Sequence, residues 1–565
     1  MSNARPAWGR VHHVVLAVAL LAALVSCGGK KAGTIQKPIT GGVKADAVET
    51  GLATAGKPQR GGILKYGLEA ESSGGYCLPE AQLAISGIQV ARAIYDTLLT
   101  VNAAGKVVPD LATSVTHNGT YTKWTINVRS GVRFHDGSPL TAQVVKNNLD
   151  AARGTYPGRK PLLAMFVYQD ITGISVTGPL QVTVTTKVPW VAFASYLAGP
   201  RFGVMAQAQL DDKKTCDRKP IGTGPFEFVS WKVGSVLKVK RNPHYWQVAP
   251  DGKPYPYLDG IDFYPIPDTS VRLNALQSGE IQAMHTSDAT TEVEQLGPLQ
   301  KKGKINLIVS AKDAEVTYLM LNASRAPFND PSMRRATAIG TSRQQMNQIA
   351  NDGFPPIDDG PFPPGTLGYL KDPGFPKVNV AEARRLVQAY EKKHGKGSAN
   401  WTLTLPNDPP TVRIGELIQE ASKKVGIKVN LNEEDQAKLI NDAIGGKYQA
   451  VTFRNHGGNE PDGQYVWWYS TSPVNFGRIK DPIIDRDLDE GRSEPDPAKR
   501  NAIYQDLNRE FAKQDWNVWS WAALWGVAER PNVHGVLGPN LPDGSKPSKE
   551  LYNGHSVLGM WMSKS

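Results

Sequence analysis

Two loops of the sequence carry polar side chains of the kinds that bind charged small molecules. The first follows a short apolar run and holds Glu69, Glu71 and Tyr76. Guanidinium and carboxylate groups form charge-assisted hydrogen bonds, and glycine lets a ligand approach the backbone closely. In each loop a plain solvated surface is the alternative. The second loop directly follows an apolar run, and its candidate ligand contacts are Arg454, Asn455, His456, Gly457, Gly458 and Asp462.

Tryptophans and one further acid complete the set of candidates. Trp519, Trp521 and Trp525 alternate along a predicted strand, so their side chains would share one face of it. Such stripes belong to the core more often than to a site, so Trp519, Trp521 and Trp468 are ligand candidates beside a core role. Asp408 stands in the loop after another predicted strand and is a candidate carboxylate there.

Patterns that would indicate catalysis are weak. The run Phe134-His135-Asp136-Gly137 puts an acid beside a base, but adjacent residues on a turn point apart. The run Gly222-Thr223-Gly224 lacks the third glycine of a dinucleotide fingerprint, and no nucleophile elbow or zinc-protease motif occurs. The ten histidines show no metal-ligand spacing. We expect no enzyme, no metal and no cofactor, with a secreted hydrolase as the less favoured alternative.

The N-terminus predicts export and a lipid anchor. Arg5 and Arg10 precede an apolar run at 14–24, which is too short to span a membrane and has the flanks of a secretory signal. Leu24-Val25-Ser26-Cys27 resembles the bacterial lipobox, although an ordinary signal with a chance cysteine is the alternative. We expect a signal peptide at 1–26, lipid on Cys27, a flexible tether at 27–59 without aromatic residues, and an extracytoplasmic location on the outer face of the membrane.

The remaining cysteines are Cys77 and Cys216. In an oxidising compartment we expect them to form a disulfide, with two separately buried thiols as the alternative.

Length and composition require more than one compact unit. At roughly 150 residues per domain, 565 residues with 40% apolar content can bury a large core. The net charge of +11 is spread along the chain, which does not favour a nucleic-acid partner. In the second half, Asn379 and Glu382 have capping-box spacing, and predicted helices alternate with predicted strands as far as 450–453. This alternation predicts an α/β lobe with a parallel-rich sheet.

An ordered series of motifs resembles the extracytoplasmic solute-binding proteins of family 5, also called cluster C, which serve peptide- and nickel-type ABC importers. The matching stretches are Gly61-Gly62-Ile63-Leu64, Ile94-Tyr95-Asp96-Thr97-Leu98-Leu99, Val108-Pro109-Asp110-Leu111-Ala112, 124–142, Pro220-Ile221-Gly222-Thr223-Gly224-Pro225-Phe226, Arg241-Asn242-Pro243-His244-Tyr245-Trp246, Leu276-Gln277-Ser278-Gly279-Glu280-Ile281 and 327–336. One such stretch would be weak, whereas the series in family order is specific.

The resemblance implies a fold and a function. The fold would be an α/β, two-lobed clamshell of the periplasmic-binding-protein type II, with mixed sheets flanked by helices. The large lobe would span 60–320 and take back 526–565, and the small lobe would span 321–525. A monomer would capture an extracellular solute, most simply an oligopeptide, and deliver it to the permease subunits of an ABC importer. The alternative is a non-peptide solute such as a glycan, a siderophore-like compound or a metal chelate.

Two positions depart from the family pattern. In peptide-binding relatives, an acid just before the position of Asn459-Glu460-Pro461 captures the peptide's amino group, and here that position is Gly457. Dipeptide-specific relatives place an Arg and Tyr clamp for the ligand carboxylate where this chain has Asn407-Asp408-Pro409-Pro410. Asp462, Asp408, Glu69 and Glu71 are the acids that could replace the missing one, and dipeptide specificity is not expected.

Overall fold

The computed structural model describes residues 56–72, 74–81, 83–161, 163–310, 315–454 and 460–564. The predicted lipidation site Cys27, the signal peptide and most of the tether lie outside the described residues. So do four of the candidate ligand contacts, Asn455, His456, Gly457 and Gly458. Within the described part of the chain, no helix is both long enough and apolar enough to cross a membrane.

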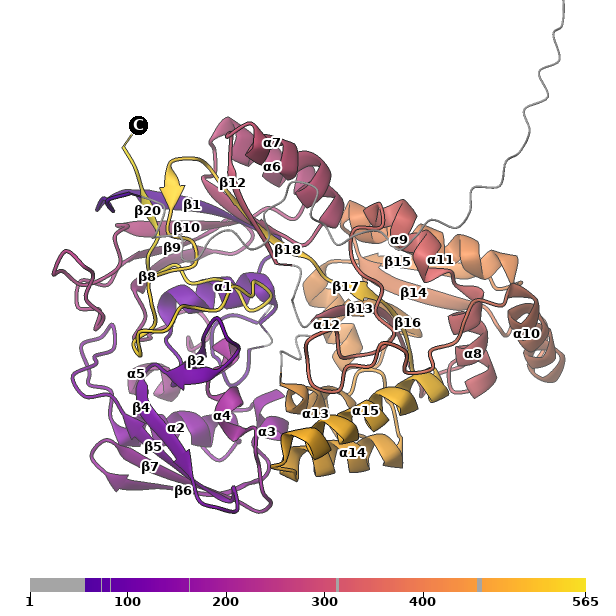
Figure 1. Cartoon of the computed structure of the whole chain (residues 1–565), viewed down its shortest axis with the longest axis horizontal. Coiled ribbons are helices and arrows are strands. Elements are labelled where there is room, and N and C mark those ends of the chain that lie inside the picture. The colour runs from indigo at the N-terminus through magenta and orange to yellow at the C-terminus, as the bar shows by residue number, and fades with distance from the viewer. Residues whose placement is uncertain are drawn as a thin grey trace, which may run out of the picture. The chain divides into compact units, whose positions relative to one another are not determined.

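A seven-stranded sheet gathers strands from both ends of the chain (Figure 1). Strand β1 pairs in parallel with β10 and β11, while β8, β9, β12 and β18 add antiparallel pairs. Its central strand β1 is apolar at Leu64, Tyr66 and Leu68, which are all buried. The strands, in sheet order, are β12 (Asn306–Ser310), β18 (Trp525–Glu529), β11 (Ala283–Thr286), β1 (Ile63–Leu68), β10 (Gly260–Pro265), β9 (Val236–Arg241) and β8 (Phe226–Lys232).

A five-stranded sheet is built from the second half of the chain. The parallel pairs β14–β15 and β14–β16 come from the predicted strand–helix alternation, and β13 and β17 complete the sheet in antiparallel pairs. In sheet order the strands are β15 (Val429–Glu434), β14 (Trp401–Pro406), β16 (Ala450–Arg454), β13 (Val316–Leu321) and β17 (Asn517–Ala522). Because β14 and β16 run parallel, Asp408 and Arg454 follow the same edge of this sheet.

The chain passes between these two sheets twice. It leaves the seven-stranded sheet after β12 and enters the five-stranded sheet at β13, and it returns between β17 and β18. The backbone N–H of Ala523 donates to the carbonyl of Glu315, so the two passages are joined by a hydrogen bond. The prediction that Trp525 shares a strand face with Trp519 and Trp521 is therefore wrong: the chain changes sheet at residues 523–524, and Trp525 begins β18.

A third sheet and two short ribbons complete the strands. The four-stranded antiparallel sheet places the alternating Trp124, Ile126 and Val128 on a buried face. Its strands, in order, are β4 (Ala112–His117), β5 (Lys123–Val128), β7 (Gln181–Thr186) and β6 (Ile171–Gly178). The ribbons are β2 (Leu99–Val101) with β3 (Val107–Pro109), and β19 (Val533–His534) with β20 (Trp561–Met562).

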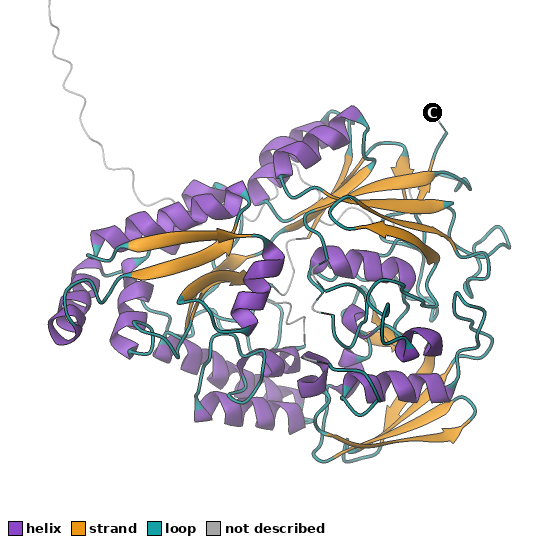
Figure 2. Ribbon diagram, turned by 180° about the vertical axis from the view of Figure 1, so that it is seen from behind, coloured by secondary structure: helices purple, strands orange, loops and turns teal. Residues whose placement is uncertain are grey.

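Helices pack around the sheets (Figure 2), and several of them begin at side-chain caps. The Asn379 side chain accepts from the N–H of Glu382, as the capping-box spacing predicts, and Asp408 accepts from the N–H of Thr411. The helices are α1 (Ile85–Ile94), α2 (Ala142–Ala152), α3 (Leu163–Val167), α4 (Phe193–Tyr196), α5 (Gln207–Asp211), α6 (Thr269–Ser278), α7 (Gly297–Lys301), α8 (Pro331–Gly340), α9 (Arg343–Asn351), α10 (Val380–His394), α11 (Pro409–Lys424), α12 (Gln436–Ile444), α13 (Tyr465–Trp468), α14 (Pro482–Ser493) and α15 (Pro497–Gln514). Short helical turns occur at η1 (Pro200–Phe202), η2 (Thr291–Leu296) and η3 (Pro461–Gln464).

The predicted disulfide is present. Cys77 and Cys216 are joined across a sequence separation of 139 residues. The guanidinium of Arg159 donates to the Sγ of Cys77, so a buried cation lies against the bridge. The disulfide fixes the loop that follows Glu69 and Glu71 to the segment around residue 216.

Candidate functional site

Glu69 lies at the end of β1 among three groups that stabilise its charge. Its carboxylate accepts from the N–H of Ser287 at 2.7 Å, and it lies 3.6 Å from Arg272 and 3.6 Å from Arg454. Burial alone would raise the pKa of Glu69, but Arg272 and Arg454 outweigh it and lower this pKa below its ordinary value. Glu69 is therefore an ionised carboxylate whose charge is already matched by protein groups.

Arg454 links the two large sheets at this point. It ends β16 of the five-stranded sheet, its guanidinium lies 4.6 Å from the ring centre of Trp525, and it faces Glu69 of the seven-stranded sheet. Trp525 is held in turn by its indole N–H, which donates to Glu315 at 2.7 Å. The stacking fixes the plane of the guanidinium while 28% of the Arg454 side chain stays exposed.

Asp408 belongs to the same electrostatic cluster. One carboxylate oxygen caps α11 by accepting from the N–H and the hydroxyl of Thr411, at 3.0 and 2.8 Å. Burial raises the pKa of Asp408 above its ordinary value; Glu69 raises this pKa further, and Arg454 lowers it. Among the predicted candidates, Glu69 and Arg454 thus form an ion pair, and Asp408 lies at the same sheet edge as Arg454; we call the three, with Arg272, the crevice cluster.

His285 supports the cluster from β11 without adding charge. Its Nε2 accepts from the backbone N–H of Glu69 at 3.0 Å and lies 3.3 Å from the hydroxyl of Ser86. Burial lowers the pKa of His285 to about 3, so the imidazole is neutral at physiological pH. Because the ring is neutral, the net charge of the cluster is set by its two acids and two arginines.

Glu71 and Tyr76 do not join the crevice cluster. Glu71 accepts from the N–H of Gly234 at 2.8 Å and from the indole of Trp231 at 3.3 Å, so it holds the turn between β8 and β9. Tyr76 is 1% exposed, and its ring packs against Trp231 at 5.3 Å between centres. Both residues stabilise the loop after β1 instead of facing Asp408.

Asp462 lies in a second, fully buried network. One carboxylate oxygen accepts from the indole N–H of Trp190 at 2.7 Å and the other from Arg492 at 2.9 Å, while Arg492 also pairs with Asp170 at 2.9 Å. The Tyr196 hydroxyl donates to the Asp462 carbonyl. We call these five residues the Asp462 network. Because both carboxylate oxygens have protein partners, we withdraw Asp462 as a ligand contact.

The remaining tryptophan candidates lie in the core. Trp519 is fully buried and packs between Tyr318, Trp468 and Phe511. Trp468 is 3% exposed and Trp521 is 4% exposed. Trp468, Trp519 and Trp521, which were expected to contact the ligand, therefore pack in the core. Trp525, which was not among the ligand candidates, contacts Arg454 of the crevice cluster.

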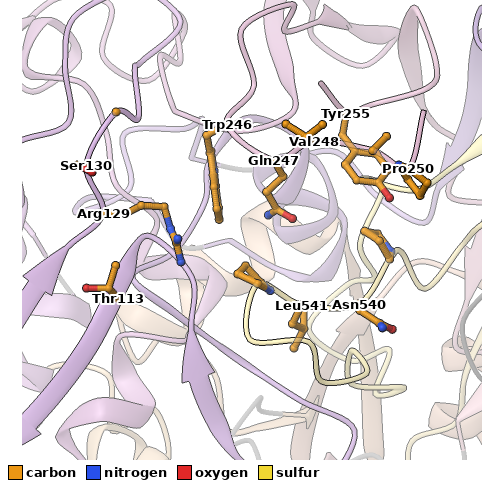
Figure 3. Close-up of a pocket in the computed structure, with 14 residues that line it drawn as sticks. Thr113, Arg129, Ser130, Trp246, Gln247, Val248, Pro250, Tyr255, Asn540 and Leu541 are labelled. Atoms are coloured by element: carbon orange, nitrogen blue, oxygen red, sulfur yellow. The ribbon is translucent and has the colours of Figure 1, made fainter. Parts of the chain in front are cut away.

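A separate groove of about 990 Å³ opens between residues 113–255 of the first half of the chain and the C-terminal segment 539–542 (Figure 3). Arg129 stacks over Trp246 at 4.6 Å on one side of it, and Tyr255 and Pro250 lie on the other. The Trp246 indole donates to the buried Asp96 at 3.1 Å. Among the described residues, none of the predicted ligand contacts lines this groove, and Arg129 is the only charged side chain in its lining.

The crevice cluster presents charged groups of both signs. Among the described residues, no set of three or more His, Cys, Asp or Glu side chains could hold a metal ion. Arg272 and His285 were not predicted from the sequence, because buried cations and neutral histidines in α6 and β11 carry no local signature. The arrangement of two acids facing two arginines, between two sheets joined by paired strand passages, fits a molecule that carries both charges.

Comparison with known proteins gives the family of this fold. The profile described as "Bacterial extracellular solute-binding proteins, family 5 Middle" matches residues 106–477. The glutathione-binding protein GsiB of Pectobacterium atrosepticum is 27% identical over 440 residues, which cover 76% of this chain and 82% of that protein. The GsiB of Shigella dysenteriae is 26% identical over 451 residues, covering 77% of this chain and 83% of that protein.

Solved structures show the same architecture. The oligopeptide-binding protein AppA of Bacillus subtilis, in complex with a nonapeptide, has a TM-score of 0.78 at 21% identity, covering 90% of this chain and 100% of that one. The protein AgaA of A. tumefaciens R10, in complex with agropinic acid, has a TM-score of 0.75 at 25% identity and covers 89% and 99% of the two chains. The two-lobed α/β fold predicted from the motif series is thereby confirmed.

Proposed function

Because the chain belongs to the bacterial extracellular solute-binding proteins of family 5, we propose that it captures an oligopeptide between its two lobes and delivers it to an ABC importer. The observation that carries this proposal is the crevice cluster, where Glu69 from the seven-stranded sheet meets Arg454 and Asp408 from the five-stranded sheet. A molecule bound there contacts both lobes at once, so its binding energy favours closure.

The strand passages between β12 and β13 and between β17 and β18 would form the hinge, and we place the lobe boundaries there. Two connections between the lobes would permit hinge bending of one lobe against the other. Glu315 and Trp525 lie at these passages. Because Arg454 stacks on Trp525, hinge bending would change the position of the Arg454 guanidinium.

The Asp462 network would form on closure. Asp170 directly precedes β6 of the four-stranded sheet, and Trp190 and Tyr196 follow its strand β7, whereas Asp462 and Arg492 belong to η3 and α14. Close to it, α3 lies beside α13 (Figure 1), and the rings of Phe166 and Tyr465 are 5.8 Å apart. We propose that this network holds the closed state from the side away from the hinge.

The cargo proposal also draws on relatives. GsiB is named for glutathione, a modified tripeptide, and AppA was solved with a nonapeptide. Proteins of this fold thus bind peptide-like molecules of different lengths. Export through residues 1–26, lipid on Cys27 and action as a monomer complete the proposal; they rest on the sequence patterns alone.

The experiment that tests this function is direct. Residues 60–565, exported without the lipid anchor, should co-purify with peptides that mass spectrometry of the extracted ligand identifies. The unloaded protein should bind these peptides in stoichiometric amounts by calorimetry without cleaving them, and glutathione and tri-alanine serve as defined probes. Cleavage of bound peptide would favour a hydrolase, and the absence of any bound peptide would contradict the peptide cargo.

A further inference from the structure

Asp408 is the acid of the crevice cluster that has an oxygen to spare. Its Oδ1 accepts both hydrogen bonds from Thr411, and no hydrogen bond to its Oδ2 occurs among the described residues. Glu69, by contrast, is matched by Ser287, Arg272 and Arg454. A cationic group of a ligand therefore gains most by approaching Asp408.

Arg454 is the cation of the cluster that has donors to spare. Within the described residues its guanidinium makes no hydrogen bond; its contacts are the 3.6 Å ion pair with Glu69 and the stacking on Trp525. Arg272 is different, because it is 1% exposed and donates to the carbonyls of His285, Ile266 and Pro267. An anionic group of a ligand therefore finds its donors on Arg454.

From these two groups we infer that the ligand is a zwitterion whose cation binds Asp408, at the N-terminus of α11, and whose anion binds Arg454, at the end of β16. This inference rests on the proposed function and names the chemistry of its cargo. Both residues follow parallel neighbours, β14 and β16, so the two charges of the ligand would lie along one edge of the five-stranded sheet.

The signs of these two charges are opposite to those implied by the resemblance for the same two loops. There, an acid in the loop after β16 and an arginine in the loop after β14 were expected. Here the loop after β16 begins with Arg454 and the loop after β14 offers Asp408. The acid missing at Gly457 is thus replaced from another strand, and a peptide would lie in the reverse direction.

Three forms of one peptide test the inference: tri-alanine, its N-acetyl form and its C-terminal amide, titrated calorimetrically into the unloaded protein. Hydrogen bonds to charged groups contribute roughly 1.5–3 kcal/mol, so the wild-type protein should bind each blocked form at least about tenfold more weakly than the zwitterion.

Two variants assign the ends. Asp408→Asn keeps the helix cap, because asparagine caps as well as aspartate, and should reduce the discrimination against the N-acetyl form to within about twofold. Arg454→Met keeps the contact with Trp525 and should remove the discrimination against the amide. Asp435→Asn, at the exposed cap of α12, and Arg129→Met, where a guanidinium also lies 4.6 Å from a tryptophan, are matched controls that should leave both ratios unchanged.

The outcomes separate the two proposals. The inference is supported if only Asp408→Asn loses the discrimination against the N-acetyl form and only Arg454→Met loses the discrimination against the amide. Equal binding of all three forms by the wild type overturns it and leaves the carrier function standing, as does the opposite assignment of the two variants. A loss confined to Arg129→Met would place the ligand in the groove of Figure 3 and overturn it too. Failure of every peptide to bind contradicts the peptide cargo itself.

Discussion

Trp190→Phe isolates the contribution of the Asp462 network to closure. The substitution keeps an aromatic ring of similar shape but removes the indole N–H that donates to Asp462 at 2.7 Å. A hydrogen bond to a charged acceptor contributes about 1.5–3 kcal/mol. If this bond exists only in the closed state, the whole loss appears in ligand binding, because closure and binding are coupled.

The expected result is a dissociation constant raised about 10- to 150-fold, since each 1.4 kcal/mol is a factor of ten. The melting temperature of the unloaded protein should change by less than about 1 °C, because unfolding entropy near 2.1 cal/mol/K per residue gives about 1 kcal/mol per degree for a chain of this size. Calorimetric titration and thermal unfolding measure the two quantities on the same sample.

Trp124→Phe is the matched control. It removes an indole N–H bond of 3.3 Å to the Tyr121 carbonyl, within the four-stranded sheet region. This variant should leave the dissociation constant unchanged. If Trp190→Phe instead lowered the melting temperature and left binding unchanged, the Asp462 network would be a permanent part of the core and our account of closure would be refuted.

Three further predictions follow from individual contacts. Gly222→Ala would place a Cβ 2.0 Å from the carbonyl oxygen of Ile94 and should cost about 1–3 kcal/mol, whereas Gly173→Ala, which meets no atom within 4 Å, should be nearly neutral in thermal unfolding. Burial raises the pKa of Asp358 to about 7, from about 3.9 in the unfolded chain. The folded protein is therefore destabilised by this carboxylate as pH rises between these two values, and not at lower pH. Asp358→Asn should raise the melting temperature at pH 8 and hardly at pH 4. Affinity for a zwitterionic peptide should fall on acidification, and at a higher pH than the pKa of an ordinary aspartate. The reason is that burial and Glu69 raise the pKa of Asp408 more than Thr411 and Arg454 lower it. This fall in affinity should be absent in Asp408→Asn.

Local patterns predict part of the elements, and tertiary contacts explain where their bounds differ. The sequence predicts strands at 181–186 and 236–241, and β7 and β9 have these bounds; α10 begins at the predicted cap Asn379. The spacing of apolar residues predicts a helix over 84–99, but α1 ends at Ile94, because the Ile94 carbonyl accepts from the N–H of Gly224, which lies far along the chain. The apolar spacing at 414–425 predicts a helix there, but α11 begins earlier, at Pro409; Asp408 followed by Pro409 is a recognisable start signal.

The sequence predicts which loops hold residues of the candidate site, but it does not predict the groups that these residues contact. Glu69, Asp408 and Arg454 were selected because they follow strands, and the structure brings these three together. Which acid has a free oxygen depends on pairings across hundreds of residues, such as that of Asp462 with Trp190, and no sequence pattern reports them. The change of sheet before Trp525 was missed for the same reason: it is visible only in strand pairing.

Closure of the lobes on a bound solute is most directly tested by small-angle X-ray scattering of residues 60–565, with and without a saturating peptide whose binding calorimetry has established. We predict that the radius of gyration decreases when the peptide is added and that Trp190→Phe reverses part of this decrease at equal occupancy. Superimposable profiles for the free and the fully occupied protein would contradict a carrier that works by closing.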